Sequence, residues 1–223
     1  MSNIMIVGAD GPVEARYHAP ASRNAPIVII APPHPKHDGT MAHKIIYLLF
    51  RVFASLNFGV LRFNFRGCGR SPGSFSGGEN EISDAAACLD WLLDNNKMAS
   101  QCWVAGYSFG AWIGMQLLMR RPECVRFISI SPPANIYDFG FLAPCPVSGL
   151  ILHGECDDMI PKESVLRLAY NLSIQRRKNA IEFHMIKGAD HSFSEHMKEL
   201  EDFVFRYSKE SLHSLDDAYS DVV

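Results

Sequence analysis

The chain has 223 residues, of which 48% are hydrophobic and 20% charged, so it can bury the core of one sizeable globular domain. Its formal net charge is −3 and neither sign forms a long block, so we expect no nucleic-acid partner. The apolar runs are too short to span a bilayer and no secretory pattern opens the sequence, so we expect a cytoplasmic protein without a membrane span.

Short apolar segments alternate along the chain with segments of helical period, an order typical of parallel strands joined by helical crossovers. The predicted strands cover residues 4–7, 13–17, 27–31, 60–64, 102–105, 127–130, 148–153 and 181–186. The predicted helices cover residues 45–56, 82–93, 111–119 and 165–172, with a last one whose apolar face runs from Phe193 to Tyr207. A turn signal at residues 10–12 makes the first two strands an antiparallel edge hairpin.

The chain shows no internal repeat and no Gly/Ser-rich linker, which predicts a single domain over residues 1–207. Residues 208–223 are polar and acidic, and we expect them to form a loosely ordered tail. Only residues 131–146 separate the sixth and seventh predicted strands, which leaves no room there for a cap domain.

Six cysteines are present without any CxxC pair, whereas disulfide frameworks and zinc sites use closely spaced pairs. We therefore expect reduced thiols. These cysteines are Cys68, Cys88, Cys102, Cys124, Cys145 and Cys156.

One serine lies at the centre of a G-x-S-x-G motif, Gly106-Tyr107-Ser108-Phe109-Gly110. An apolar strand segment precedes the motif and a segment of helical period follows it. A strand-to-helix turn of this kind exposes the hydroxyl above the sheet, and glycine on either side lets strand and helix approach closely. The motif predicts that Ser108 is a nucleophile; the alternative is an ordinary serine at a helix N-cap.

Two later loops carry the groups that activate such a serine. A serine hydroxyl needs a neutral imidazole as base and a third group that holds the imidazole in the correct tautomer. Asp157 and Asp158 follow the seventh predicted strand, and His191 follows the eighth. Helix N-capping is the alternative for the two carboxylates, and a surface position at a helix N-terminus is the alternative for the histidine.

With these motifs the sequence resembles, over nearly its whole length, the small lidless α/β hydrolases of the dienelactone-hydrolase-like and bacterial esterase kind. The resemblance implies the α/β-hydrolase fold: a mostly parallel eight-stranded sheet with helices on both faces and no cap domain. The order Ser, Asp, His is the one expected there. The HGxxDxxxP segment at residues 153–161 implies Asp157 as the acid, with Asp158 as the alternative, and the ADHxF segment at residues 189–193 implies His191 as the base.

The same resemblance implies an oxyanion hole made of two backbone N–H groups. One belongs to Phe109. The other is expected in the loop after the third predicted strand. There His34-Pro35 stands where relatives have His-Gly, which makes the Lys36 N–H the candidate and the His37 N–H the alternative. Residues 64–73 resemble the family's NxRGxGxSxG segment, and we expect Arg66 to brace loops rather than to bind substrate.

These expectations predict a serine hydrolase that cleaves a small-molecule carboxyl ester or thioester through an acyl-enzyme, with no cofactor and no metal. The alternatives are a prolyl-oligopeptidase-like peptidase, a non-catalytic binding protein of the same fold, and a metalloenzyme. The sequence leaves open whether the protein forms a homodimer. The metal ligands in that last case would be His34, His37, Asp38 and His43. The apolar walls of an open cleft are expected from Tyr107, Phe109, Phe141, Leu142, Met159 and Phe193.

Overall fold

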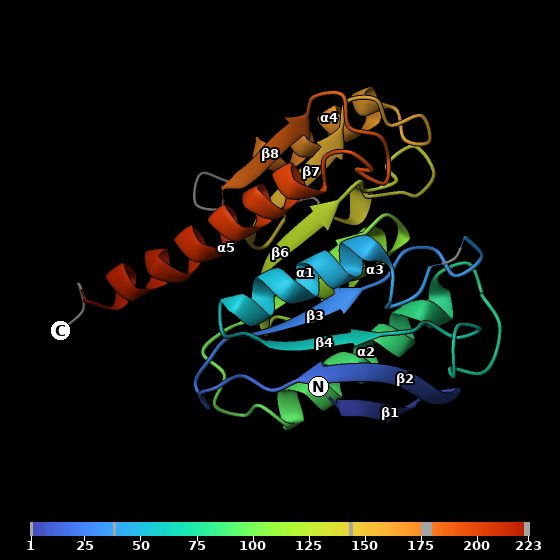
Figure 1. Ribbon diagram of the computed structural model, residues 1–223, viewed down its shortest axis with the longest axis vertical. Helices are drawn as coiled ribbons and strands as arrows, with labels where there is room; N and C mark the ends of the chain where they lie inside the picture. Colours follow the sequence, from blue (N-terminus) through green and yellow to red (C-terminus); the bar gives the residue numbers. More distant parts are fainter. Residues whose placement is uncertain (1, 38, 143–144, 175–179, 221–223) are drawn as a thin grey trace.

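In the computed structural model, which describes residues 2–37, 39–142, 145–174 and 180–220, eight strands form one sheet in the order β1-β2-β4-β3-β5-β6-β7-β8 (Figure 1). The strands are β1 (Ser2–Gly8), β2 (Gly11–His18), β3 (Ile27–Ala31), β4 (Gly59–Phe63), β5 (Cys102–Tyr107), β6 (Cys124–Ile130), β7 (Ser148–Gly154) and β8 (Ile181–Ile186). Strands β3 to β8 pair in parallel, and β2 is antiparallel to both β1 and β4. The predicted mostly parallel sheet with an edge hairpin is confirmed.

Helices cover both faces of the sheet, because each face carries its own set of buried apolar side chains. The helices are α1 (Lys44–Ser55), α2 (Glu79–Asp94), α3 (Phe109–Arg120), α4 (Lys162–Ser173) and α5 (Met197–Ser220), with a short 3-10 turn η1 (Gly140–Leu142). Side chains from α1 and α5 join one buried cluster, and side chains from α2, α3 and α4 join the other. Figure 1 shows α1 and α5 in front of the strands. No helix in the described ranges is long and apolar enough to cross a membrane.

The last helix corrects two expectations. It begins at Met197, and Phe193 lies before it in a loop, with a φ of 52° and a fully buried side chain. Where a loosely ordered tail was expected after residue 207, the helix continues to Ser220. Packing supports the helix as far as residue 212, because Ser208 and Ser211 are buried and Leu212 contacts the core cluster of α1 and α5.

The parallel strands all end at one edge of the sheet, where the loops after β3, β5, β7 and β8 come together (Figure 1). In open α/β sheets this carboxyl edge is the place where ligands bind. The predicted site residues belong to these four loops or to the helix start that follows β5. The topology therefore gathers them although they are far apart in the chain.

A buried ion-pair network braces the segment that follows β4. The Arg66 guanidinium donates to both carboxylate oxygens of Asp84 at 2.6 and 3.0 Å, to Asp10 at 2.8 Å and to the Asn80 carbonyl at 3.0 Å. Arg66 and Asp84 are both buried. All five donors of a guanidinium lie in a fixed fork, which suits this set of acceptors. The contacts support the expectation that Arg66 braces loops.

Replacing Arg66 by alanine is expected to lower the free energy of unfolding by about 3–5 kcal/mol, because the Asp84 carboxylate would stay buried without its partner. Arg121→Ala is the matched control, since its ion-pair partners Asp90 and Glu123 are exposed and such pairs contribute about 1 kcal/mol or less. Urea unfolding of both variants at pH 7 measures the difference. Equal losses in the two variants would contradict the bracing role.

Candidate active site

Ser108 lies on a sharp turn between β5 and α3. Its backbone has φ 52° and ψ −121°, a conformation that costs a non-glycine residue roughly 1–3 kcal/mol. The turn is tight: a Cβ on Gly106 would lie 2.3 Å from the Gly110 carbonyl oxygen, and a Cβ on Gly110 would lie 2.2 Å from the Ala31 carbonyl oxygen. The Ser108 N–H donates to the Ile130 carbonyl at 2.8 Å, which fixes the turn to β6. The half-buried hydroxyl is thereby held at the carboxyl edge of the sheet.

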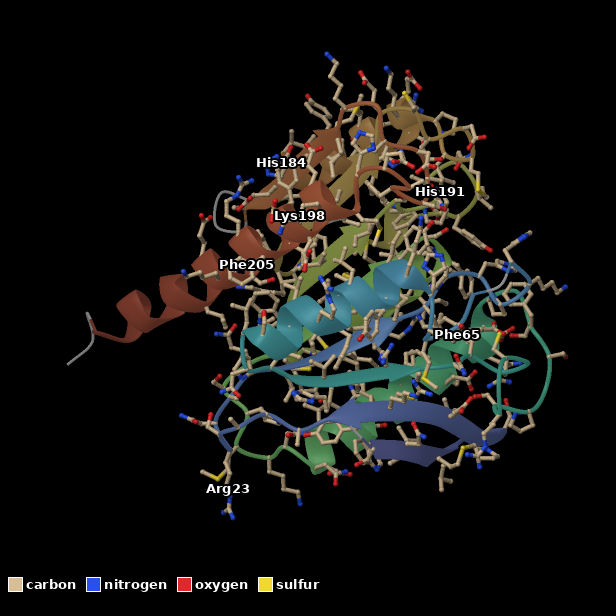
Figure 2. All side chains as sticks on the ribbon, in the orientation of Figure 1. Arg23, Phe65, His184, His191, Lys198 and Phe205 are labelled. Atoms are coloured by element: carbon tan, nitrogen blue, oxygen red, sulfur yellow. The ribbon has the colours of Figure 1, made fainter. Side chains whose placement is uncertain are left out.

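The three side chains predicted for the site meet in one line. His191 Nδ1 lies 2.7 Å from Asp157 Oδ2, and His191 Nε2 lies 3.2 Å from Ser108 Oγ. A carboxylate only accepts hydrogen bonds, so Nδ1 carries the hydrogen and a neutral ring has its free lone pair on Nε2. That lone pair faces the serine hydroxyl, which is the arrangement a base needs to take the hydroxyl proton. Figure 2 shows His191 among the loops at this edge, at the opposite end of the molecule from Arg23.

Asp157 is oriented by its own loop. Its Oδ1 accepts the backbone N–H groups of Met159 at 3.0 Å and Ile160 at 2.8 Å, which leaves Oδ2 for His191. The Asp157 side chain is fully buried, whereas Asp158 is exposed. The helix α4 that follows has Pro161 at its N-cap, so helix capping does not account for Asp157.

The backbone of His191 is also held by two hydroxyl groups for which the sequence analysis proposed no such contact. Its carbonyl oxygen accepts the Tyr107 hydroxyl at 3.1 Å and lies 3.5 Å from the Ser131 hydroxyl. Burial raises the pKa of Tyr107 to about 12, so the phenol stays protonated and can donate. Tyr107 occupies a variable position of the G-x-S-x-G motif, and the motif carries no signal for this contact.

A second imidazole lies against the Tyr107 ring. His43 stacks on it with ring centroids 5.0 Å apart, and its Nδ1 accepts the Ile45 N–H at the start of α1. Burial, together with Lys44 and His191, lowers the pKa of His43 to about 4, so the ring is neutral near pH 7. The Nδ1 lone pair of His43 is thus used by the Ile45 N–H and is not available to a metal.

The residues considered as metal ligands do not form a site in the described part of the chain. The His34 and His37 rings have centroids 4.9 Å apart, but no group of three or more His, Cys, Asp or Glu is placed to hold an ion among the described residues. Asp38 lies outside those residues. The cysteines are free, and five of the six are buried.

The two predicted oxyanion donors differ in availability. Phe109 is the first residue of α3, where a backbone N–H has no partner within the helix. The Lys36 N–H, in contrast, donates to His34 Nδ1 at 3.1 Å, and the alternative His37 N–H donates to the His34 carbonyl at 2.9 Å. Both candidates of this loop are therefore engaged locally in the structure.

The expected apolar walls are only partly present. Four of the six predicted residues are buried in the core, because the sheet and its helices cover them: Tyr107, Phe109, Leu142 and Phe193. Of the predicted wall residues, Phe141 is half-buried and Met159 is exposed. The buried Phe109 ring contacts five aromatic rings that were not proposed as walls, namely those of His34, Phe65, Phe75, Trp112 and Tyr137.

Comparison with known proteins places these features in a family context. Residues 12–179 match the model of the X-Pro dipeptidyl-peptidase (S15) family. The uncharacterized protein RP471 of Rickettsia prowazekii is 45% identical over 196 residues, which covers 86% of this chain and 82% of that protein.

Solved structures share the whole architecture. ATU1826 of Agrobacterium tumefaciens, a protein of unknown function assigned provisionally to the α/β hydrolases, is 46% identical with a TM-score of 0.93 and covers 96% of this chain and 97% of its own. XC6422 of Xanthomonas campestris, an α/β serine hydrolase without a lid, is 25% identical with a TM-score of 0.82 and covers 94% of both chains.

Proposed function

Because the chain belongs to the S15 family of the α/β hydrolases and has the architecture of the lidless serine hydrolases, we propose that it cleaves a small carboxyl ester or thioester through an acyl-enzyme on Ser108. One observation carries the proposal. The hydroxyl, the imidazole and the carboxylate form an unbroken line of contacts, at 3.2 and 2.7 Å, on a strained turn at the ligand-binding edge of the sheet.

In the proposed acylation, Ser108 Oγ attacks the acyl carbon and its proton moves to His191 Nε2. Asp157 stays ionised and stabilises the imidazolium through the 2.7 Å contact. Collapse of the tetrahedral intermediate breaks the bond to the leaving oxygen or sulfur, which takes the proton from Nε2. In deacylation a water gives a proton to Nε2 and attacks the acyl carbon; the bond from that carbon to Ser108 Oγ then breaks, Oγ takes the proton back from Nε2, and the acid is released.

The negative charge on the acyl oxygen needs donors that are already oriented. We assign the first to the Phe109 N–H, which lies next to the nucleophile at the start of α3. The Lys36 N–H could serve as the second donor only after it releases His34 Nδ1, for instance when the His34 ring turns or takes a proton. The second donor therefore depends on a rearrangement of the loop after β3.

A peptidase is the second candidate, because the matching family model is that of an X-Pro dipeptidyl-peptidase. We favour an ester or thioester over a peptide as the substrate because the architecture resembles that of a hydrolase without a lid. Only residues 131–147 lie between β6 and β7, so the site is expected to be open. An alcohol or thiol also leaves more readily than an amine, which must be protonated as it departs.

A substrate panel separates the two candidates. It contains p-nitrophenyl esters of graded chain length, acyl-CoA thioesters and Xaa-Pro p-nitroanilides. We expect measurable kcat/KM values for the short esters or for the thioesters and far lower values for the anilides. Cleavage of an Xaa-Pro anilide with a higher kcat/KM than any ester or thioester would assign the protein to the peptidases instead.

A further inference from the structure

His153, a histidine distinct from His191 and His43, lies next to Asp157 of the proposed triad and takes no part in the reaction steps above. His153 is on β7, four residues before Asp157, and its side chain is completely buried. Its Nε2 lies 3.0 Å from the Ile160 carbonyl oxygen, and its Nδ1 lies 3.7 Å from Asp157 Oδ2. A fully buried imidazole in an apolar strand needs an explanation, because burial of a polar ring is costly unless its nitrogens are satisfied.

The contacts determine where the His153 proton sits. A carbonyl oxygen can only accept, so Nε2 carries the hydrogen and donates it to Ile160. In the neutral ring Nδ1 is then a bare lone pair, and it has no hydrogen-bond partner in the described part of the chain. It therefore cannot donate to Asp157 Oδ2, the oxygen that accepts the His191 Nδ1–H.

Ile160 links His153 to the acid. Its carbonyl accepts from His153, and its N–H donates to Asp157 Oδ1 at 2.8 Å. Anchoring Ile160 to β7 thus fixes one of the two amides that orient the carboxylate. The same loop is also linked to the loop that follows β8, since the Cys156 N–H donates to the Ala189 carbonyl at 2.9 Å.

On this basis we infer that His153 is a positioning residue for the acid: as a neutral imidazole it anchors Ile160, and it leaves Asp157 Oδ2 entirely to His191. The inference rests on the proposed function of the triad. A protonated His153 would donate from Nδ1 to the same Oδ2 and compete with His191.

The surroundings of His153 favour its neutral form. Burial lowers its pKa, and the charge that His191 takes up during the reaction acts in the same direction. Asp157 and the Ile160 carbonyl act in the opposite direction, but burial is the largest influence. These are the groups that act on the ring, and the net direction keeps the competing Nδ1–H absent near neutral pH.

The chain offers a matched pair of variants. The amide nitrogen of glutamine can reach the place of Nε2, so His153→Gln keeps the donor to Ile160. The amide of asparagine lies near the place of Nδ1, so His153→Asn leaves the Ile160 carbonyl unpaired and brings a donor toward Asp157. His153→Leu removes the Ile160 donor without adding a competing one, and it serves as a second variant if His153→Asn does not fold.

The test measures kcat, KM and the pH profile of kcat/KM on the best ester or thioester, with Ser108→Ala in parallel. For His153→Asn and His153→Leu we expect an about 100-fold fall in kcat with little change in KM, and an acidic limb shifted to lower pH because the His191 imidazolium is less well stabilised. For His153→Gln we expect kcat within about threefold of the parent. Equal effects of Gln and Asn, or an unchanged acidic limb, would overturn the inference.

A readout without substrate keeps this inference separate from the proposed function. The His191 Nδ1–H that bonds to Asp157 gives a downfield proton NMR resonance, and we expect it to exchange with water faster in His153→Asn and His153→Leu than in the parent and His153→Gln. Equal exchange rates in all four proteins would refute the positioning role whether or not an ester is cleaved. Ester cleavage that survives in Ser108→Ala would instead refute the proposed function, and the exchange rates would still test the positioning role of His153.

Discussion

Ser108→Ala is expected to lower kcat/KM for the best ester or thioester about a millionfold, the loss seen when the nucleophile of a cooperating triad is removed. The methyl group can neither attack the acyl carbon nor donate to His191 Nε2, which lies 3.2 Å from Ser108 Oγ. The fold should survive, because the Ser108 N–H and not its hydroxyl bonds to the Ile130 carbonyl. The residual rate then reflects only substrate binding and oxyanion stabilisation.

Ser173→Ala is the matched control, since that exposed hydroxyl donates to the Tyr170 carbonyl one turn before it, near the end of α4. We expect it to keep the parent rate. If Ser108→Ala also hydrolysed the substrate at the parent rate, another residue would have to be the nucleophile, and the line of contacts through His191 would have no catalytic meaning.

Asp157→Asn is expected to lower kcat by about four orders of magnitude while the backbone stays in place. Asparagine can still accept the Met159 and Ile160 N–H groups with its oxygen, which would turn its NH₂ group toward His191. An NH₂ group donates, so it would favour the His191 tautomer with the hydrogen on Nε2, and that tautomer cannot accept the serine proton. Steady-state kinetics at pH 7 measures the loss.

Asp158→Asn provides the control for Asp157→Asn. The two carboxylates are adjacent in sequence, but Asp158 is exposed and Asp157 is buried against His191. We expect Asp158→Asn to keep kcat close to that of the parent. A large loss in Asp158→Asn together with a small one in Asp157→Asn would transfer the role of the acid to Asp158.

Much of the fold was accessible from local sequence patterns. All eight strands lie where apolar β-branched segments predicted them. The signal is strongest for β3, β4 and β5, which are buried along their whole length, because a strand buried on both faces needs a continuous apolar run. The boundaries were less accurate: β5 extends to Tyr107 where the prediction ended at 105, since the pairing of Tyr107 with Ile130 in β6 adds hydrogen bonds that no local pattern encodes. Local composition also failed just past residue 207, where the buried Ser208 and Ser211 and the packing of Leu212 support a helix in a polar segment.

The contacts between distant segments could not be predicted. The motifs select Ser108 and His191 by their neighbours in sequence, but the clamp of the Tyr107 hydroxyl on the His191 carbonyl joins residues 84 positions apart. The second oxyanion donor stays a prediction, because the hydrogen bond from the Lys36 N–H to His34 Nδ1 follows from the conformation of one loop, which the motif does not encode. His153 belongs to a segment that the sequence singled out for Asp157, yet only the burial of its ring and the direction of its two nitrogens reveal a role.

Covalent trapping tests the central claim, that Ser108 is a nucleophile activated by His191 and Asp157. The parent protein is incubated with a fluorophosphonate and its intact mass is measured, followed by peptide mapping. We expect a single adduct on Ser108, formed slowly in Asp157→Asn and absent from Ser108→Ala. An adduct on another residue, or equal labelling of the parent and Ser108→Ala, would contradict it.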